Sequence, residues 1–184
     1  MTEFVDLAHQ GPLTGRRLVV SWSPGDGVRA GIDQTLAQGF ARHSVDLAAK
    51  LGAEGSEWVA QAAVIGERRK SWRRGVIADL VEEVLPVDLI PGLRRTVAPT
   101  LAVVAARPLP DGATELLLMP HASHTGDPQA AFGAAPRVRA AADGLAAAAG
   151  AAGALIEADR RSLGVRDPDC PASRAAAKRL LGWK

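Results

Sequence analysis

The stretch TVAPTLAVVAARPLPDGATELLLM, residues 96–119, decides the fold class of this chain. It holds two runs rich in aliphatic and β-branched residues, 96–107 and 113–119, joined by PLPDG at 108–112. Proline, aspartate and glycine are typical turn residues, so the stretch predicts a β-hairpin. Residues 116–119 are all apolar, which makes both faces of the second strand apolar. We therefore expect that strand near the centre of a sheet that is covered on both sides.

A third strand is predicted upstream, at residues 17–23, because Leu18, Val20 and Trp22 alternate there with polar neighbours before a Pro-Gly-Asp-Gly turn. Elsewhere the apolar residues recur at helical spacing. Ser56 and Asp169 stand where helix caps are expected. The pattern predicts helices over 28–51, 56–85, 137–162 and 171–181.

The predicted order of strand, helix, helix, strand, strand, helix, helix is typical of an α+β protein and not of a doubly wound parallel sheet. We expect a small antiparallel sheet with strands near 17–23, 96–107 and 113–119. Several helices should pack against it, including a long Ala-rich helix in the C-terminal part. The expected organisation is one α+β domain over 1–164, with 165–184 as a short helical tail that packs on it.

Composition limits the classes of protein that fit. Of the 184 residues 47% are hydrophobic and 23% charged, which is typical of a globular chain. A net charge of +2 gives no overall attraction to nucleic acid, so any such contact must be local. The longest apolar run, 144–156, is too short to span a membrane. The single cysteine, Cys170, and the absence of a signal-peptide pattern predict a soluble, cytoplasmic protein without cofactor.

The segment ERRKSWRR, residues 67–74, surrounds one tryptophan with five cations. If 56–85 is a single helix, Arg69 and Arg73 fall on its apolar face together with Trp72. In one interpretation the helix kinks near Lys70 and the arginines point to water.

In a second interpretation Arg69 and Arg73 form a fork for a carboxylate or phosphate, with Trp72 as a flat wall. In a third, all the cations contact an anionic lipid or nucleic-acid surface. The predicted ligand-binding face comprises Arg68, Arg69, Trp72, Arg73 and Arg74.

Three other segments carry weaker signals. The turn at 23–31 offers backbone N–H groups to an anion, but the spacing of a dinucleotide-binding loop is absent. His121, His124 and Asp127 could hold a divalent metal if their segment turns, although exposed loop histidines are the expected outcome. His43 is expected at the surface or boundary of a helix.

The sequence thus favours a binding or interaction protein whose basic helical face contacts an anionic small molecule or a protein partner. No catalytic residue is assigned. The alternative is a metal-assisted hydrolase that uses His121, His124 and Asp127. Close packing of the Ala-rich helix, around 140–156, makes a homo-oligomer a further expectation. Nucleic acid or a membrane surface is expected only through the basic residues 68–74.

Overall fold

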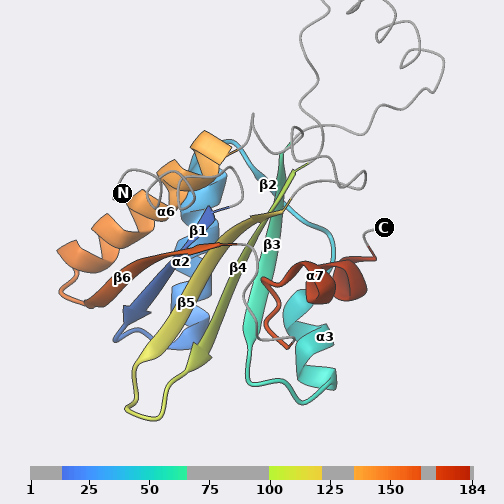
Figure 1. The fold of residues 1–184 in the computed structure, drawn as a ribbon, viewed down its shortest axis with the longest axis horizontal. Coiled ribbons are helices and arrows are strands. Elements are labelled where there is room, and N and C mark those ends of the chain that lie inside the picture. The colour runs from blue at the N-terminus through green and yellow to red at the C-terminus, as the bar shows by residue number, and fades with distance from the viewer. Residues whose placement is uncertain (1–13, 66–99, 122–134, 163–168, 183–184) are drawn as a thin grey trace, which may run out of the picture.

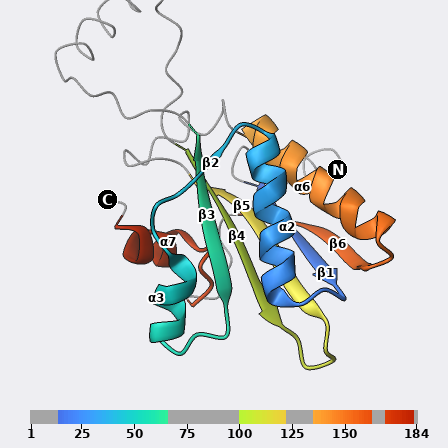
Figure 2. The same ribbon diagram turned by 180° about the vertical axis from the view of Figure 1, so that it is seen from behind.

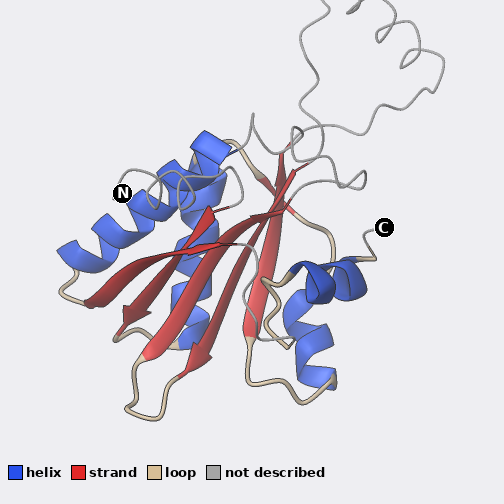
Figure 3. Ribbon diagram, in the orientation of Figure 1, coloured by secondary structure: helices blue, strands red, loops and turns tan. Residues whose placement is uncertain are grey.

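A computed structural model describes residues 14–65, 100–121, 135–162 and 169–182 of the chain. These residues form a mixed α and β structure, drawn in Figures 1 and 3. In chain order the elements are β1 (Thr14–Val20), α2 (Pro24–Ala37), β2 (Ala41–Arg42), α3 (Leu47–Ala53), β3 (Val59–Ile65), β4 (Thr100–Pro108), β5 (Thr114–His121), α6 (Ala135–Ala151), β6 (Leu155–Ser162) and α7 (Arg174–Leu181).

The strands form one sheet in the order β2-β3-β4-β5-β1-β6, and each neighbouring pair is antiparallel. The predicted hairpin is confirmed as β4 and β5, the two central strands, with Val104 opposite Leu118. Its turn closes when the Leu109 N–H donates to the Ala113 carbonyl at 2.7 Å. Gly112 has φ +82° there, a conformation that favours glycine. The α+β class and the antiparallel sheet are therefore as predicted.

Side chains that alternate along the central strands form two separate cores, one on each face of the sheet. On the first face Leu118 of β5 packs with Ile32 of α2 and Leu145 of α6. On the second face Leu117 packs with residues of α3 and α7. Figures 1 and 2 show these three layers, with α2 and α6 on one side of the sheet and α3 and α7 on the other. Within the described residues, no helix is both long and apolar enough to cross a membrane.

The single helix predicted over 28–51 is wrong, because the chain forms α2, β2 and α3 there. Helix α2 ends at Ala37, and Gly39 follows with φ +87°. A new helix then begins after Asp46, whose carboxylate accepts a hydrogen bond from the Ala49 N–H at 3.0 Å. A turn residue and a capping residue thus override a helical spacing that continues across them.

The helix predicted over 56–85 is wrong over the part that the structure describes, since Val59–Ile65 is the strand β3. Ala60 and Ala62 face the second core, whereas Ala63 faces the first. A short apolar run that is buried on both faces fits helix and strand spacing equally well. Pairing with β4 decides in favour of the strand, over a register from Val59 opposite Ala106 to Ile65 opposite Thr100.

Ser56, the predicted cap of that helix, lies instead in the turn before β3, where its hydroxyl accepts a hydrogen bond from the Trp58 N–H at 3.2 Å. Residues 66–85, and with them the question of a kink near Lys70, lie outside the described part of the chain.

The Ala-rich helix is confirmed as α6 but is shorter than the predicted 137–162. It ends at Ala151, Gly153 adopts φ +64°, and β6 pairs antiparallel with β1. Alanine favours helix locally, but pairing with the edge of β1 determines the last part of the segment. The final helix also begins later than predicted, because Ser173 and not Asp169 caps it by accepting from the Ala176 N–H.

Candidate functional site

Most of the residues singled out in the sequence lie outside the described part of the chain. This holds for the predicted basic face, which comprises Arg68, Arg69, Trp72, Arg73 and Arg74, and for His124 and Asp127. His121 is described, and it is a buried residue at the end of β5, opposite Leu101. The expectation of an exposed loop histidine is therefore wrong for His121, because β5 continues past Met119. Among the described residues no three His, Cys, Asp or Glu side chains form a group that could hold a metal ion.

A cleft of about 520 Å³ lies on the described surface, at the β2 edge of the sheet. It is bounded by the first two turns of α2, the connection from β2 to α3, and the first half of β3. Figures 1 and 2 show α2 and α3 on opposite faces of the sheet. Because residues of both helices and of β3 line the cleft, it lies between the two helices at β3. Its volume lies within the usual range of small-molecule sites, about 300–1,000 Å³.

One wall of the cleft carries two arginines. Arg29 of α2 and Arg42 of β2 both line it. Arg29 pairs with Asp26 at 3.0 Å. Arg42 donates to the Gln61 side chain at 3.0 Å and pairs with Asp33 at 3.5 Å. The side chains of Arg29 and Arg42 are 70% and 49% exposed, and exposed ion pairs contribute little stability. Both guanidinium groups can therefore exchange these partners for a ligand anion at low cost.

The opposite wall is mainly apolar. It is formed by Val45, Leu47 and Ala48 at the start of α3. The one carboxylate on this wall, that of Asp46, accepts the Ala49 N–H and so is directed to the helix N-terminus. A charged wall thus faces an apolar wall across the cleft.

His43 joins the two walls. Its backbone N–H donates to the Ala62 carbonyl at 2.9 Å, and its Nδ1 accepts the Val45 N–H at 3.1 Å. Burial lowers the pKa of His43 below its usual value, because the charged imidazolium loses water. At neutral pH the ring is therefore neutral, and the bond to Nδ1 assigns its proton to Nε2. His43 offers the cleft a hydrogen-bond donor of fixed tautomer.

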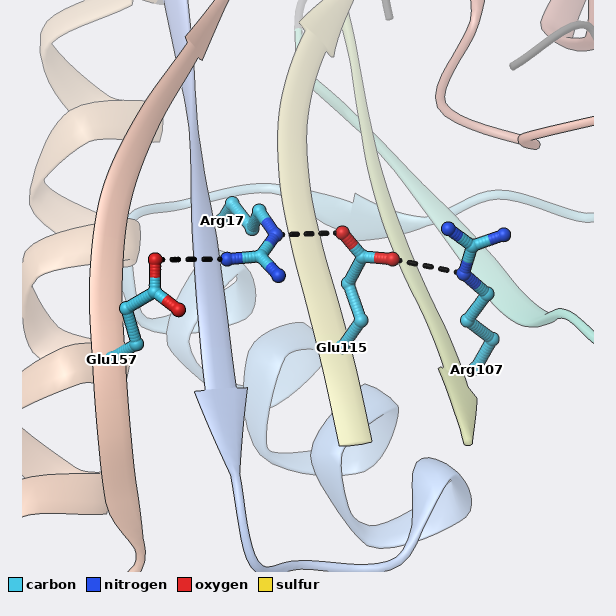
Figure 4. A network of polar contacts seen from close by, with 4 residues as sticks. All are labelled: Arg17, Arg107, Glu115 and Glu157. Atoms are coloured by element: carbon cyan, nitrogen blue, oxygen red, sulfur yellow. Dashed lines mark hydrogen bonds and ion pairs between the residues drawn. The ribbon is translucent and has the colours of Figure 1, made fainter. Parts of the chain in front are cut away.

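A second group of charges lies on the sheet and not in the cleft. Figure 4 shows Glu157, Arg17, Glu115 and Arg107 in a row across β6, β1, β5 and β4. Arg17 donates to Glu115 at 2.7 Å and pairs with Glu157 at 3.1 Å. Glu115 also accepts from the Arg107 Nε at 2.8 Å. Ion pairs along four adjacent strands hold the strands in register, so we assign this row a structural role.

A smaller hollow of about 370 Å³ lies beside the end of that row. The Arg107 guanidinium stacks on the Trp58 ring there, 4.7 Å from its centroid, and the Arg179–Glu54 ion pair forms part of the rim. Both acidic and basic side chains line this hollow, among them Glu54, Asp169 and Arg107. It therefore selects no ligand class as clearly as the cleft does.

No family model, no curated protein and no solved structure matches this chain. The candidate site thus rests on the geometry of the described residues. The sequence does not indicate Arg29 and Arg42 as a pair, because they belong to different elements that only the fold brings together. The one useful signal was the turn at 23–31, which contains Arg29 and leads into α2.

Proposed function

We propose that this protein binds a small amphipathic anion in the cleft between α2 and α3. The observation that supports the proposal is the pairing of a wall carrying Arg29 and Arg42 with an apolar wall at Val45 and Leu47. An acid with an apolar group would match both walls, and the His43 Nε2–H would add a neutral donor. Because Nδ1 of His43 already accepts a hydrogen bond, these groups support binding without a chemical step.

The test uses four probes of similar length: hexanoate, hexyl phosphate, hexanol and hexylammonium. We expect the two anions to bind, as followed by shifts of the amide signals of residues 42–48 in NMR titrations. Arg42→Gln and Arg29→Gln should each weaken anion binding by about fivefold to tenfold, as expected for one charge-assisted contact at a partly exposed site.

Arg179→Gln is the matched control, since Arg179 is an exposed, paired arginine that does not line the cleft. It should leave anion binding unchanged. Equal binding of hexanoate and hexylammonium, or an equal loss in the Arg179 variant, would contradict the proposal.

The predicted basic face at 68–74 stays a second proposal for contact with an anionic ligand, a protein partner, a membrane surface or nucleic acid. It is supported by the five cations around Trp72 in the sequence. Arg69→Leu combined with Arg73→Leu should abolish salt-dependent retention on heparin or on anionic vesicles. If the wild-type protein is not retained on heparin or on anionic vesicles, contact of this face with nucleic acid or with a membrane surface is excluded.

The metal-assisted hydrolase is the competing proposal, and its support is the His121, His124 and Asp127 spacing. Stoichiometric metal after purification would favour it over a binding protein. A homo-oligomer and a cytoplasmic location also stay proposals. The lone and buried Cys170 suits a reducing compartment.

A further inference from the structure

The ladder between β2 and β3 stops part-way along β3. Ala41 lies opposite Val64, and the His43 N–H donates to the Ala62 carbonyl. If the ladder continued, Val45 would lie opposite Ala60 in the next hydrogen-bonding position. Instead the Val45 N–H donates to the His43 ring, and within the described residues no backbone hydrogen bond joins Val45 to Ala60.

The backbone groups of Ala60 therefore face the cleft. In an antiparallel strand the N–H and C=O of one residue point to the same side, and those of the next residue point to the other side. The backbone groups of Ala60 therefore point to the same side as those of Ala62, away from β4. Ala60 lines the cleft, and it is only 2% exposed. Buried backbone N–H and C=O groups are nearly always hydrogen-bonded in native proteins. A donor and an acceptor with the spacing of a strand edge are thus available at the floor of the cleft.

We propose that the anion bound in the cleft carries a secondary amide next to its carboxylate. Such a ligand is the C-terminal residue of a peptide or an N-acylated amino acid. Its amide N–H donates to the C=O of Ala60, and one of its carboxylate oxygens accepts from the N–H of Ala60, as the N–H and C=O of one residue do in an antiparallel pair. The ligand thus takes the place that a longer β2 would occupy, which is strand addition at a sheet edge. This inference rests on the proposed function and adds the chemistry that distinguishes the ligand from a plain fatty or phosphate anion.

The charges and apolar groups around Ala60 fit the rest of such a ligand. Arg42 and Gln61 lie on the α2 side of the edge and supply donors for the carboxylate. Val45 and Leu47 lie on the α3 side and suit an apolar side chain. Main-chain pairing with Ala60 then favours ligands that carry an amide. The wall with Arg42 favours a negative charge, and the wall with Val45 and Leu47 favours an apolar group.

The test compares N-acetyl-leucine with two analogues in NMR titrations of the wild-type protein. N-acetyl-N-methyl-leucine lacks the amide proton, and 4-methylpentanoate keeps the carboxylate and the branched chain but lacks the amide. We expect N-acetyl-leucine to bind about tenfold more tightly than either, which is the size expected for loss of a buried hydrogen bond. Changing the ligand avoids Ala60→Pro, which would remove the N–H but endanger the strand.

The amide of Ala60 provides a direct readout. Its hydrogen exchange should slow on addition of N-acetyl-leucine, whereas that of Ala63, which lies opposite Ala102 and faces β4, should not change. Tighter binding of acetyl-Gly-Gly-Leu than of N-acetyl-leucine would identify a peptide end as the ligand, and equal binding an N-acyl amino acid.

Equal affinity of the three leucine-like acids, together with loss of affinity in Arg42→Gln, would overturn this inference and leave the anion site in place. If none of the acids binds, both the inference and the proposed function fail.

Discussion

Arg17 and Glu115 are the two most buried charged residues in the row across the sheet. The side chain of Arg17 is 15% exposed and that of Glu115 is 10% exposed. Burial lowers the pKa of Arg17, but the hydrogen bonds and charges of Glu115 and Glu157 outweigh it, so the pKa lies above its usual value. The guanidinium is therefore charged at every pH at which the protein is folded. The stability of the folded protein therefore depends on the carboxylates of Glu115 and Glu157, which pair with this guanidinium.

Glu115→Gln should destabilise the protein by about 2–3 kcal/mol, because it leaves the largely buried guanidinium of Arg17 and the partly buried one of Arg107 with a weaker partner. Glu157→Gln is the matched control, since Glu157 also pairs with Arg17 but is 57% exposed. That change should cost no more than about 1 kcal/mol. Urea unfolding of the two variants measures the difference. Equal losses of unfolding free energy in the two variants would show that burial does not determine how much each ion pair of the row contributes to stability.

His43 should give the protein a measurable dependence of stability on pH. Its folded pKa is lowered by burial, whereas in the unfolded chain it is about 6.5. Between these two values the unfolded state binds more protons, so the free energy of unfolding falls as the pH decreases below about 6.5 and levels off below the folded pKa. His43→Gln should remove this component. Urea unfolding of both proteins between pH 5 and 7.5 tests it, and identical slopes would contradict the assignment.

The hairpin of β4 and β5 was predictable because its information is local. The turn residues stand between two apolar runs, and Leu116 to Met119 show two apolar faces without reference to any other part of the chain. For β3 and β6 the decisive interaction is pairing with strands that are distant in sequence. Single-chain periodicity does not contain that information, so both segments were predicted as helix.

The candidate site was less predictable than the fold. Arg42 and His43 belong to a strand of two residues and to the connection after it, which is too short for any periodic pattern. Their role depends on α2, on α3 and on an interrupted ladder with β3. No spacing of residues along the sequence encodes this combination, whereas a local run of cations such as that at 68–74 is visible in the sequence alone.

The contact of α2 with the sheet depends on Gly31. A Cβ at this position would lie 2.6 Å from Cγ1 of Val104, a stiff β-branched side chain in the central strand β4. Gly31→Ala should therefore destabilise the protein by about 1–2 kcal/mol, because the overpacking exceeds the gain in helix propensity. Gly52→Ala in α3 is the control, since a Cβ there meets nothing within 4 Å.

The Gly52 variant should be more stable than the wild type by about 0.5–1 kcal/mol. Thermal unfolding of the two variants gives the comparison. A stabilised Gly31 variant would mean that α2 can move away from β4 without cost.

At the scale of the molecule, two cores share one sheet, and the cleft lies at the edge where their helices diverge. The first core holds α2 and α6, and the second holds α3 and α7. Helix α7 is joined to α3 by the Lys50 Nζ, which donates to the Leu180 carbonyl at 2.6 Å. Helix α7 thus lies beside α3, the helix whose first residues form the apolar wall of the cleft.

Leu180→Ala tests whether the C-terminal helix folds as one unit with the sheet. Leu180 is 2% exposed and packs in the core that contains Leu47 and Trp58, so its truncation should cost about 2–4 kcal/mol. The neighbouring Arg179→Ala is the control, because Arg179 forms an exposed pair with Glu54 and should change stability by less than about 1 kcal/mol. Tryptophan fluorescence and far-ultraviolet circular dichroism should give coincident urea transitions in all three proteins, as expected for one cooperative unit. If the Leu180 variant loses helical signal before the main transition and keeps the wild-type midpoint, residues 165–184 are instead a tail that docks on an independently stable domain.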